Sequence, residues 1–296
     1  MAEELHISKR PTLERPVLVA AFRGWNDGAQ GASLAGGYLA KTWEAERFAT
    51  LDPEGFYDFQ ATRPHVSLVD GLTRKVEWPE NAFYHATPPE LGRGALLLLG
   101  VEPNLRWRRF TSLIVDVAQQ QKVELVVTLG ALLADVPHTR PSPVTGTATD
   151  PELVERLGLS ASRYEGPTGI VGILHDACRG ADLPSVSLWA AVPHYASLAP
   201  SPRAAVALLN RLGNLLDAPI ETAELEEAAD AYTQQVSEAV ATDEETAAYV
   251  EELEQRADTL GAELELPSGD SIAAELTRFL REREAGNGGP NDQREQ

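Results

Sequence analysis

Apolar residues gather in four short runs along the chain. The runs cover residues 16–22, 95–101, 125–133 and 186–192. None of them alternates cleanly between apolar and polar positions, and strands that are covered on both faces need not alternate. We therefore interpret the four runs as central strands of a largely parallel sheet.

Helical periodicity appears between these runs. After Asn104 the apolar positions are Phe110, Leu113, Ile114 and Val117, and after Ser201 they are Val206, Leu209, Leu212 and Leu216. Strands that alternate with amphipathic helices predict right-handed crossovers and a three-layer α/β/α domain, which we place at residues 14–218. Residues 48–84 mix short β-like pieces with proline and glycine, and we expect antiparallel strands there at an edge of the sheet.

The pattern changes after residue 218. Apolar residues at helical spacing predict a helix from Thr222, and Thr242 followed by Glu245 is the pattern of a capping box that opens a second helix. We expect these two helices to form a hairpin. The sequence thus predicts an acidic helical extension that follows the α/β domain.

The extension, residues 219–285, also contains a third predicted amphipathic helix from about residue 270, with Phe279 facing inward. Residues 286–296 have neither an apolar stripe nor an aromatic anchor, so we assign them to a disordered tail.

Charge is concentrated in the extension. The chain carries a net charge of −20, and residues 221–265 hold 15 acidic side chains against the single Arg256, which is 14 of the 20 net negative charges. Such a surface repels phosphate backbones, so we expect no nucleic-acid partner. No apolar run reaches the length of a membrane span, and residues 1–10 lack the core of a signal peptide, so we expect a cytoplasmic protein that does not bind membranes.

Cys178 is the only cysteine. A single cysteine excludes an internal disulfide and any multi-cysteine metal site. We interpret it as a small core residue.

Ligands of parallel sheets bind beyond the carboxyl ends of the strands, so the loops after the four runs are the candidate site. The first loop contains Arg23, Trp25, Asn26 and Asp27 and leads into a glycine-rich helix. Backbone amides there can receive an anion or a partner. The alternative is close packing of that helix on the sheet, because neither a phosphate-loop nor a dinucleotide-binding glycine pattern is present.

The second loop contains Glu102, a possible acceptor for a ligand, and Asn104, which we expect to cap the next helix. The third loop places His138 near Arg140, and the fourth contains His194. Polar groups of the third loop either form a site or satisfy the backbone of a proline-braced loop, and the sequence leaves both possibilities open.

Tyr195 follows His194 directly, and the two histidines are expected above neighbouring strands. Two histidines without further ligands predict no metal site. No nucleophile elbow or other catalytic set is recognisable, and nothing predicts a cofactor. Another glycine-rich segment, residues 166–172, also lacks a nucleotide fingerprint.

Taken together, these segments resemble the proteasome assembly chaperone two family, in its actinobacterial branch. The matching segments are residues 22–27, 136–141, 166–172 and 192–195, within residues 14–218. The resemblance implies a nucleoside-phosphorylase-like α/β/α fold and a homo-oligomer, with a trimer as the best expectation. It also implies a possible proteasome-related protein partner.

This chain differs from the family pattern in two respects, and each limits which functional properties the resemblance implies. Phosphorylases hold phosphate in a glycine-rich, hydroxyl-bearing turn, whereas residues 128–133 of this chain are mainly aliphatic. We therefore expect no phosphorolysis of nucleosides. The chain ends in Asp292-Gln293-Arg294-Glu295-Gln296, which lacks the hydrophobic residue and tyrosine of proteasome-docking tails.

The leading hypothesis is a non-catalytic binding or assembly factor that presents its loops and acidic helices to a protein partner. In that case Tyr232 and Tyr249 meet a basic partner, unless the acidic helices pack on their own domain. The alternative is an enzyme of the phosphorylase or hydrolase type that acts on a nucleoside-like small molecule. Arg23 and Arg140 would then hold an anion, His138 or His194 would move a proton, and Glu102 would orient a hydroxyl.

Overall fold

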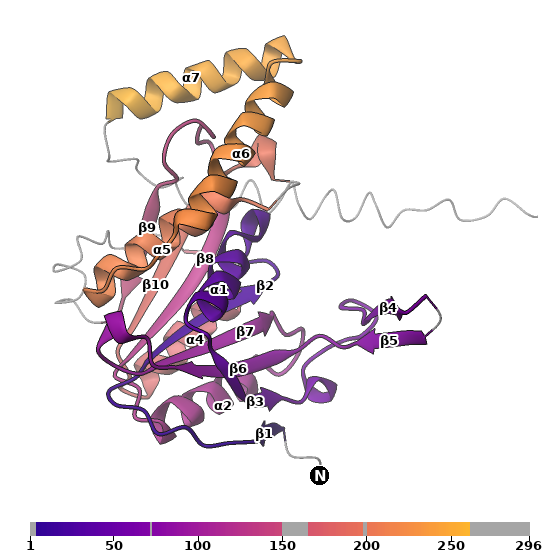
Figure 1. Cartoon of the computed structure of the whole chain (residues 1–296), viewed down its shortest axis with the longest axis vertical. Coiled ribbons are helices and arrows are strands. Elements are labelled where there is room, and N and C mark those ends of the chain that lie inside the picture. The colour runs from indigo at the N-terminus through magenta and orange to yellow at the C-terminus, as the bar shows by residue number, and fades with distance from the viewer. Residues whose placement is uncertain (1–3, 72, 150–164, 198–199, 261–296) are drawn as a thin grey trace, which may run out of the picture.

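A computed structural model of the 296-residue chain describes residues 4–71, 73–149, 165–197 and 200–260. Its central feature is an eight-stranded sheet with the strand order β1-β3-β6-β7-β2-β8-β10-β9. Helices lie on both faces of this sheet (Figure 1).

The four predicted strands form the middle of the sheet. They are β7 (Ala95–Val101), β2 (Val17–Arg23), β8 (Leu125–Ala134) and β10 (Ser185–Pro193). Each is parallel to its neighbour. Alternate residues of β2 enter different layers of the core: Val19 packs with one set of helices and Leu18 with the other. This burial on both faces explains why the strands are almost continuously apolar.

The outer strands pair antiparallel, so the sheet is mixed. They are β6 (Asn81–Ala86), β3 (Glu46–Leu51) and β1 (Leu5–Ile7) on one side and β9 (Val144–Ala148) on the other. The prediction of antiparallel edge strands within residues 48–84 is confirmed for β3 and β6. By contrast, β4 (His65–Val69) and β5 (Thr73–Glu77) do not join the edge but form a separate two-stranded hairpin that projects from the body (Figure 1).

Two helices cover each face of the sheet. Helices α1 (Gly31–Thr42) and α5 (Pro202–Leu216) pack with one core layer, and α2 (Trp107–Gln120) and α4 (Ile170–Gly180) with the other. Short 3-10 helices occur at Gly28–Gln30, Pro53–Gly55, Pro89–Leu91 and His194–Ala196. The predicted three-layer α/β/α architecture is confirmed.

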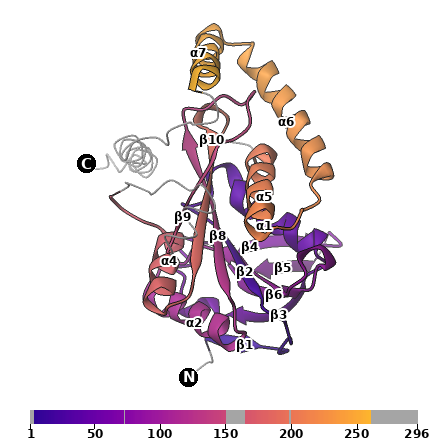
Figure 2. The same cartoon turned by 90° about the vertical axis from the view of Figure 1, so that its left-hand side faces the viewer.

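The acidic extension begins with α6 (Ala223–Val240), followed by α7 (Glu244–Leu260). The two helices meet at an angle rather than lying along each other, and α7 crosses above the ends of the central strands (Figures 1 and 2). They are consecutive and joined by a short turn, but they do not lie side by side as the expected helical hairpin would.

The predicted capping box is also wrong in its residues. The side chain of Asp243 accepts hydrogen bonds from the amides of Glu245 and Thr246, at 3.0 and 3.5 Å. The Thr242 hydroxyl instead donates to the carbonyl of Ala239, at the end of α6. Asp243 caps the N-terminus of α7 in place of Thr242, because its carboxylate accepts hydrogen bonds from two amides at the positive end of that helix.

The expected third helix with Phe279 and the expected tail at 286–296 lie outside the described residues. No helix in the part of the chain that the structure describes has the length and hydropathy needed to span a membrane.

Candidate functional site

Glu102, which follows β7, is bound on both of its carboxylate oxygens. Oε2 accepts from the Trp25 amide at 3.1 Å. Oε1 accepts from Asn26 Nδ2 at 2.9 Å and from the Ile170 amide at 2.8 Å. We call these four residues the Glu102 cluster. Its carboxylate occupies the N-terminus of α4, where negative charge is favourable.

Two glycines make room for this cluster. A Cβ at Gly169 would lie 2.3 Å from Asn26 Oδ1, and a Cβ at Gly24 would lie 2.8 Å from the Cβ of Glu102. Gly24 also has a φ of +135°, which disfavours other residues. The glycines in these two segments thus permit a close contact between β2, β7 and α4.

Asp27 fills the N-terminus of α1 in the same way. Its Oδ1 accepts from the amides of Ala32 and Ser33, at 2.9 and 3.0 Å. Burial raises the pKa of Asp27, and its hydrogen bonds to Ser33 and Ala32 act against that rise. The α1 amides that Sequence analysis offered to an external anion therefore bind the chain's own carboxylate.

Arg23 and Asn104 lie outside this cluster. The Arg23 side chain is exposed at the end of β2 and makes no hydrogen bond or ion pair with any described residue, whereas the Arg23 carbonyl accepts from the Glu102 amide at 2.8 Å. Asn104 does not cap α2, whose N-cap position is Arg106. Its Oδ1 accepts instead from the Asp58 amide at 3.1 Å and the Thr62 hydroxyl at 3.0 Å, so the expected capping is wrong and Asn104 fixes the loop that precedes the hairpin.

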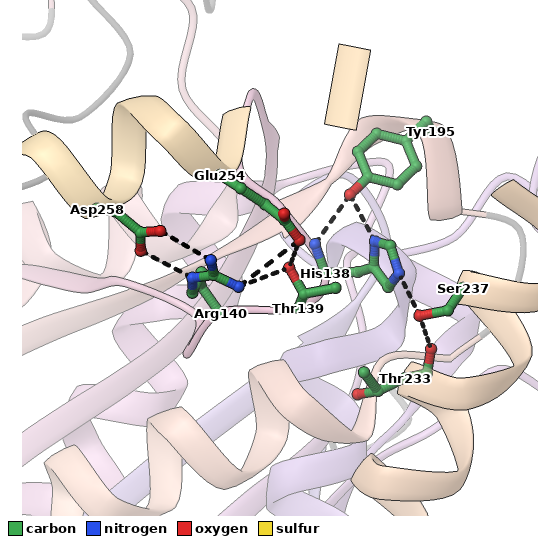
Figure 3. Close-up of polar contacts among 8 residues, drawn as sticks. All are labelled: His138, Thr139, Arg140, Tyr195, Thr233, Ser237, Glu254 and Asp258. Carbon is green, nitrogen blue, oxygen red and sulfur yellow. Dashed lines mark hydrogen bonds and ion pairs between the residues drawn. The ribbon is translucent and has the colours of Figure 1, made fainter. Parts of the chain in front are cut away.

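The second group of polar residues surrounds His138, which is 2% exposed (Figure 3). The Tyr195 hydroxyl lies 2.8 Å from both the His138 amide and His138 Nδ1. His138 Nε2 lies 2.9 Å from Ser237 Oγ, and Ser237 donates to the Thr233 carbonyl at 2.8 Å. We call this chain of hydrogen bonds the His138 relay.

The proton positions in the relay follow from its two ends. The hydroxyl hydrogen of Ser237 is used on Thr233, so Ser237 must accept from a proton on His138 Nε2. The Tyr195 oxygen accepts from the His138 amide, so its hydroxyl donates to an unprotonated Nδ1. Burial raises the pKa of Tyr195 to about 12, which keeps that donor in place. The relay therefore holds His138 as the neutral tautomer, and burial lowers its pKa in agreement.

Arg140 attaches α7 to the same loop (Figure 3). Its guanidinium donates from Nε and Nη2 to the two carboxylate oxygens of Asp258, each at 2.8 Å. Nη1 lies 3.6 Å from Glu254, which also accepts from the Thr139 hydroxyl. The hydrogen bond from Arg140 lowers the pKa of Asp258. We call these four residues the α7 clamp.

Aromatic rings complete the attachment of the helices. The His194 ring lies 5.7 Å from that of Tyr195 and 5.6 Å from that of Tyr249, measured between centroids. Tyr232 is buried, and its hydroxyl donates to the Ala196 carbonyl at 3.2 Å. Burial leaves the Tyr232 ring no surface for a basic partner, and the half-buried Tyr249 ring packs on its own domain, as in the alternative of a self-packed extension.

The candidate residues thus divide into two groups and do not converge. Among the described residues, no hydrogen bond or ion pair joins the Glu102 cluster to the His138 relay or the α7 clamp. Two shallow surface hollows, of about 290 and 320 Å³, lie elsewhere, lined by Trp43 and His85 and by residues 5–10. Within the described ranges, no three His, Cys, Asp or Glu side chains are placed to hold a metal ion.

Sequence analysis found the residues of the loops but missed those that bind them. Ser237, Glu254 and Asp258 lie 99 to 118 positions away from their partners in the loop 138–140. The concentration of acid in the extension and the presence of Arg140 were the available signals. These two signals indicated that the acidic extension attracts Arg140, but they did not specify which carboxylates form the α7 clamp.

Solved structures of similar proteins match most of this chain. A PAC2 family protein from Streptomyces avermitilis is 49% identical, with a TM-score of 0.72, over 79% of this chain and 99% of that one. A proteasome-assembly chaperone homologue from Mycobacterium tuberculosis is 46% identical, with a TM-score of 0.73 and the same coverage. PbaB, an archaeal proteasome activator from Pyrococcus furiosus, shares the fold at 17% identity and a TM-score of 0.66, over 79% of this chain and 97% of PbaB.

A search of curated proteins gave no match. The sequence model of the PAC2 family, in contrast, matches residues 21–240, which include the Glu102 cluster, the His138 relay and α6. This match covers well over half of the chain and agrees with the similarity to the Streptomyces and Mycobacterium structures. The chain belongs to the PAC2 family.

Proposed function

We propose that this protein is an assembly factor that works by binding another protein rather than by catalysis. The observation that carries the proposal is the use of the polar side chains at the strand ends. Glu102 and Asp27 bind the amides of two helices, and His138 and Arg140 bind α6 and α7. Groups that an enzyme would direct at a substrate are thus directed at the protein's own elements.

The partner class follows from the relatives. One similar structure belongs to a proteasome-assembly chaperone homologue and a more distant one to an archaeal proteasome activator. We therefore propose proteasome subunits, or assembly intermediates of the proteasome, as the partner.

The outer side of the extension is the surface best suited to a basic partner. Its exposed carboxylates are Glu226, Glu227, Asp230 and Glu238 on α6 and Glu244, Glu245, Glu251 and Glu252 on α7. Such a field accelerates encounter with a surface of opposite charge. The inner side of the same helices is fixed by the His138 relay and the α7 clamp, so the acidic surface is presented in one orientation.

A binding experiment with purified proteasome subunits tests this proposal. The full chain is mixed with separately purified α and β subunits, and complexes are separated by size exclusion and identified by native mass spectrometry. We expect the variant Glu227→Lys/Glu244→Lys to bind at least tenfold more weakly than the parent. The control Glu90→Lys/Asp116→Lys changes the charge equally at exposed positions elsewhere and should bind as the parent does. Absence of any complex, or equal loss in both variants, would refute the proposal.

A further inference from the structure

The carboxyl ends of β8 and β10 are covered by one of the chain's own helices. β8 ends at Ala134 and β10 at Pro193, and α7 crosses above both ends (Figures 1 and 2). Open α/β sheets bind their ligands beyond the carboxyl ends of the strands. The position at which a ligand is expected is therefore occupied here by α7.

The polar contacts beneath α7 recognise carboxylates. The Arg140 guanidinium donates to both carboxylate oxygens of Asp258, and the Thr139 hydroxyl donates to Glu254 (Figure 3). The planar guanidinium suits a carboxylate because it presents two parallel N–H groups. Glu254 and Asp258 are four positions apart, so both project from one face of the helix. The loop thus binds a pair of acids on one helical face.

Aromatic rings form the other part of this contact. The Tyr249 ring of α7 lies 5.6 Å from the His194 ring and 6.3 Å from the Tyr195 ring, measured between centroids. Four residues of the α/β/α domain therefore contact side chains of α7, and we call them the helix-binding surface: Thr139, Arg140, His194 and Tyr195. This surface is complementary to an acidic helix that carries an aromatic ring.

The attachment of α7 is weak compared with the packing of the sheet. The Arg140 and Asp258 side chains are 36% and 59% exposed, and ion pairs exposed to this extent contribute little to stability. Among the described side chains of α7, the buried ones are Val250, Leu253 and Ala257. Elements with few buried apolar contacts open at a lower cost than the whole domain. α7 can therefore leave the surface while the α/β/α domain stays folded.

The extent of the family match also separates α7 from the surface that it covers. The PAC2 model matches residues 21–240, which include all four residues of the helix-binding surface, whereas α7 begins at Glu244. The surface thus lies within the part of the chain that matches the family, and its cover lies outside that part. This division favours an α7 that occupies a binding surface of the domain over an α7 that is integral to it.

We propose that the helix-binding surface binds an acidic amphipathic helix of a partner protein and that α7 blocks this site in cis. The partner helix supplies two carboxylates four positions apart, for Thr139 and Arg140, and an aromatic ring for His194 and Tyr195. A tethered helix competes at an effective concentration on the order of millimolar, so the partner binds only when α7 is displaced. The inference does not depend on the function proposed above, because it concerns the inner side of α7 and its test contains no proteasome subunit.

A labelled peptide with the sequence of residues 243–260 is the probe, and fluorescence anisotropy measures its binding to the full chain. Glu254→Gln/Asp258→Asn weakens the contact in cis, so this protein should bind the peptide at least tenfold more tightly than the parent does. Glu251→Gln/Glu252→Gln is the matched control, because it removes the same charge from exposed positions of α7. We expect the control to bind as weakly as the parent. No binding to the first variant, or equal binding by all three proteins, would overturn the proposal.

A second set of measurements locates the bound peptide. Arg140→Ala, added to Glu254→Gln/Asp258→Asn, should abolish binding. A peptide in which Gln and Asn replace the same two acids should not bind the Glu254→Gln/Asp258→Asn protein. Circular dichroism and melting curves establish that each protein is folded. Undiminished binding in either case would show that the peptide binds elsewhere, which contradicts the assignment of the helix-binding surface.

Discussion

At the residue scale, Gly169 shows why the glycine-rich segments lack a nucleotide-binding pattern. Its φ of −96° is open to any residue, so the requirement for glycine is steric. The position of a Cβ is already occupied by the amide of Asn26 and by Glu102 Oε1. Glycine here permits the contact of two buried segments rather than the approach of a phosphate.

This contact predicts a measurable cost for one added methyl group. Gly169→Ala should lower the free energy of unfolding by about 1 to 3 kcal/mol, because Asn26 is 1% exposed and has little room to move. Gly37→Ala is the matched control, since a Cβ at this position in α1 meets nothing within 4 Å. We expect that substitution to stabilise the protein by about 0.5 to 1 kcal/mol, and urea denaturation of both variants measures the difference. A Gly169→Ala protein as stable as the parent would contradict the packing described for the Glu102 cluster.

His138 predicts a specific dependence of stability on pH. Burial lowers its folded-state pKa, with a raising effect from Glu254 and a lowering one from Arg203. The contribution of neutral His138 to the free energy of unfolding is therefore complete above the unfolded-state pKa of about 6.5. It is lost as the pH falls from there through the lowered folded-state pKa. The melting temperature of the parent should drop between pH 7.5 and 5.5 by more than that of His138→Gln.

The comparison between the two proteins isolates His138. Burial also lowers the pKa of His85 and His175, but these residues are present in both proteins and their effects cancel. Parallel pH profiles for the parent and His138→Gln would show that the relay does not hold His138 neutral.

At the element scale, the central strands were predictable because burial on both faces gives them an unbroken apolar sequence. β9 was missed because its sequence, Val144–Ala148, contains a glycine and two threonines and is only partly buried. The prediction that Asn104 caps the next helix was wrong for a different reason. The loop at 58–62 recruits its side chain, and α2 begins only at Trp107.

The position of α7 depends on contacts between distant parts of the sequence, which makes it testable by substitution. Arg140→Ala removes both hydrogen bonds to Asp258, so amide hydrogen exchange in residues 244–260 should become several-fold faster while that of α1 stays unchanged. Arg256→Ala removes a pair with Glu252 within α7 itself and should leave the exchange of the helix close to that of the parent. Unchanged exchange after Arg140→Ala would mean that the clamp does not hold α7.

At the scale of the whole molecule, the sequence indicated the α/β/α body and the acidic extension but not how the two join. Periodicity identifies which face of a helix is apolar, whereas the partner of that face depends on contacts such as those of Tyr232 and Tyr249. The hairpin at β4–β5 was likewise hidden among prolines and glycines, because two short strands outside the sheet give no stronger pattern than an edge.

We predict that the α/β/α domain does not catalyse the phosphorolysis of nucleosides. Residues 128–133, which would have to receive phosphate, lie within β8, and the hydroxyl of buried Thr128 donates to Ser187 Oγ at 2.9 Å. We expect no phosphate-dependent release of base from common nucleosides in a chromatographic assay. Release that Arg140→Ala abolishes would instead support the enzymatic alternative.

The most direct test of the proposed function is the time course of proteasome core-particle formation from separately purified subunits, followed by native mass spectrometry with and without the full chain. An equal amount of an unrelated acidic protein serves as the control for bulk charge. The account predicts faster appearance of the assembled particle, or accumulation of an intermediate that contains this protein. An unchanged time course with no complex at any stage would contradict it.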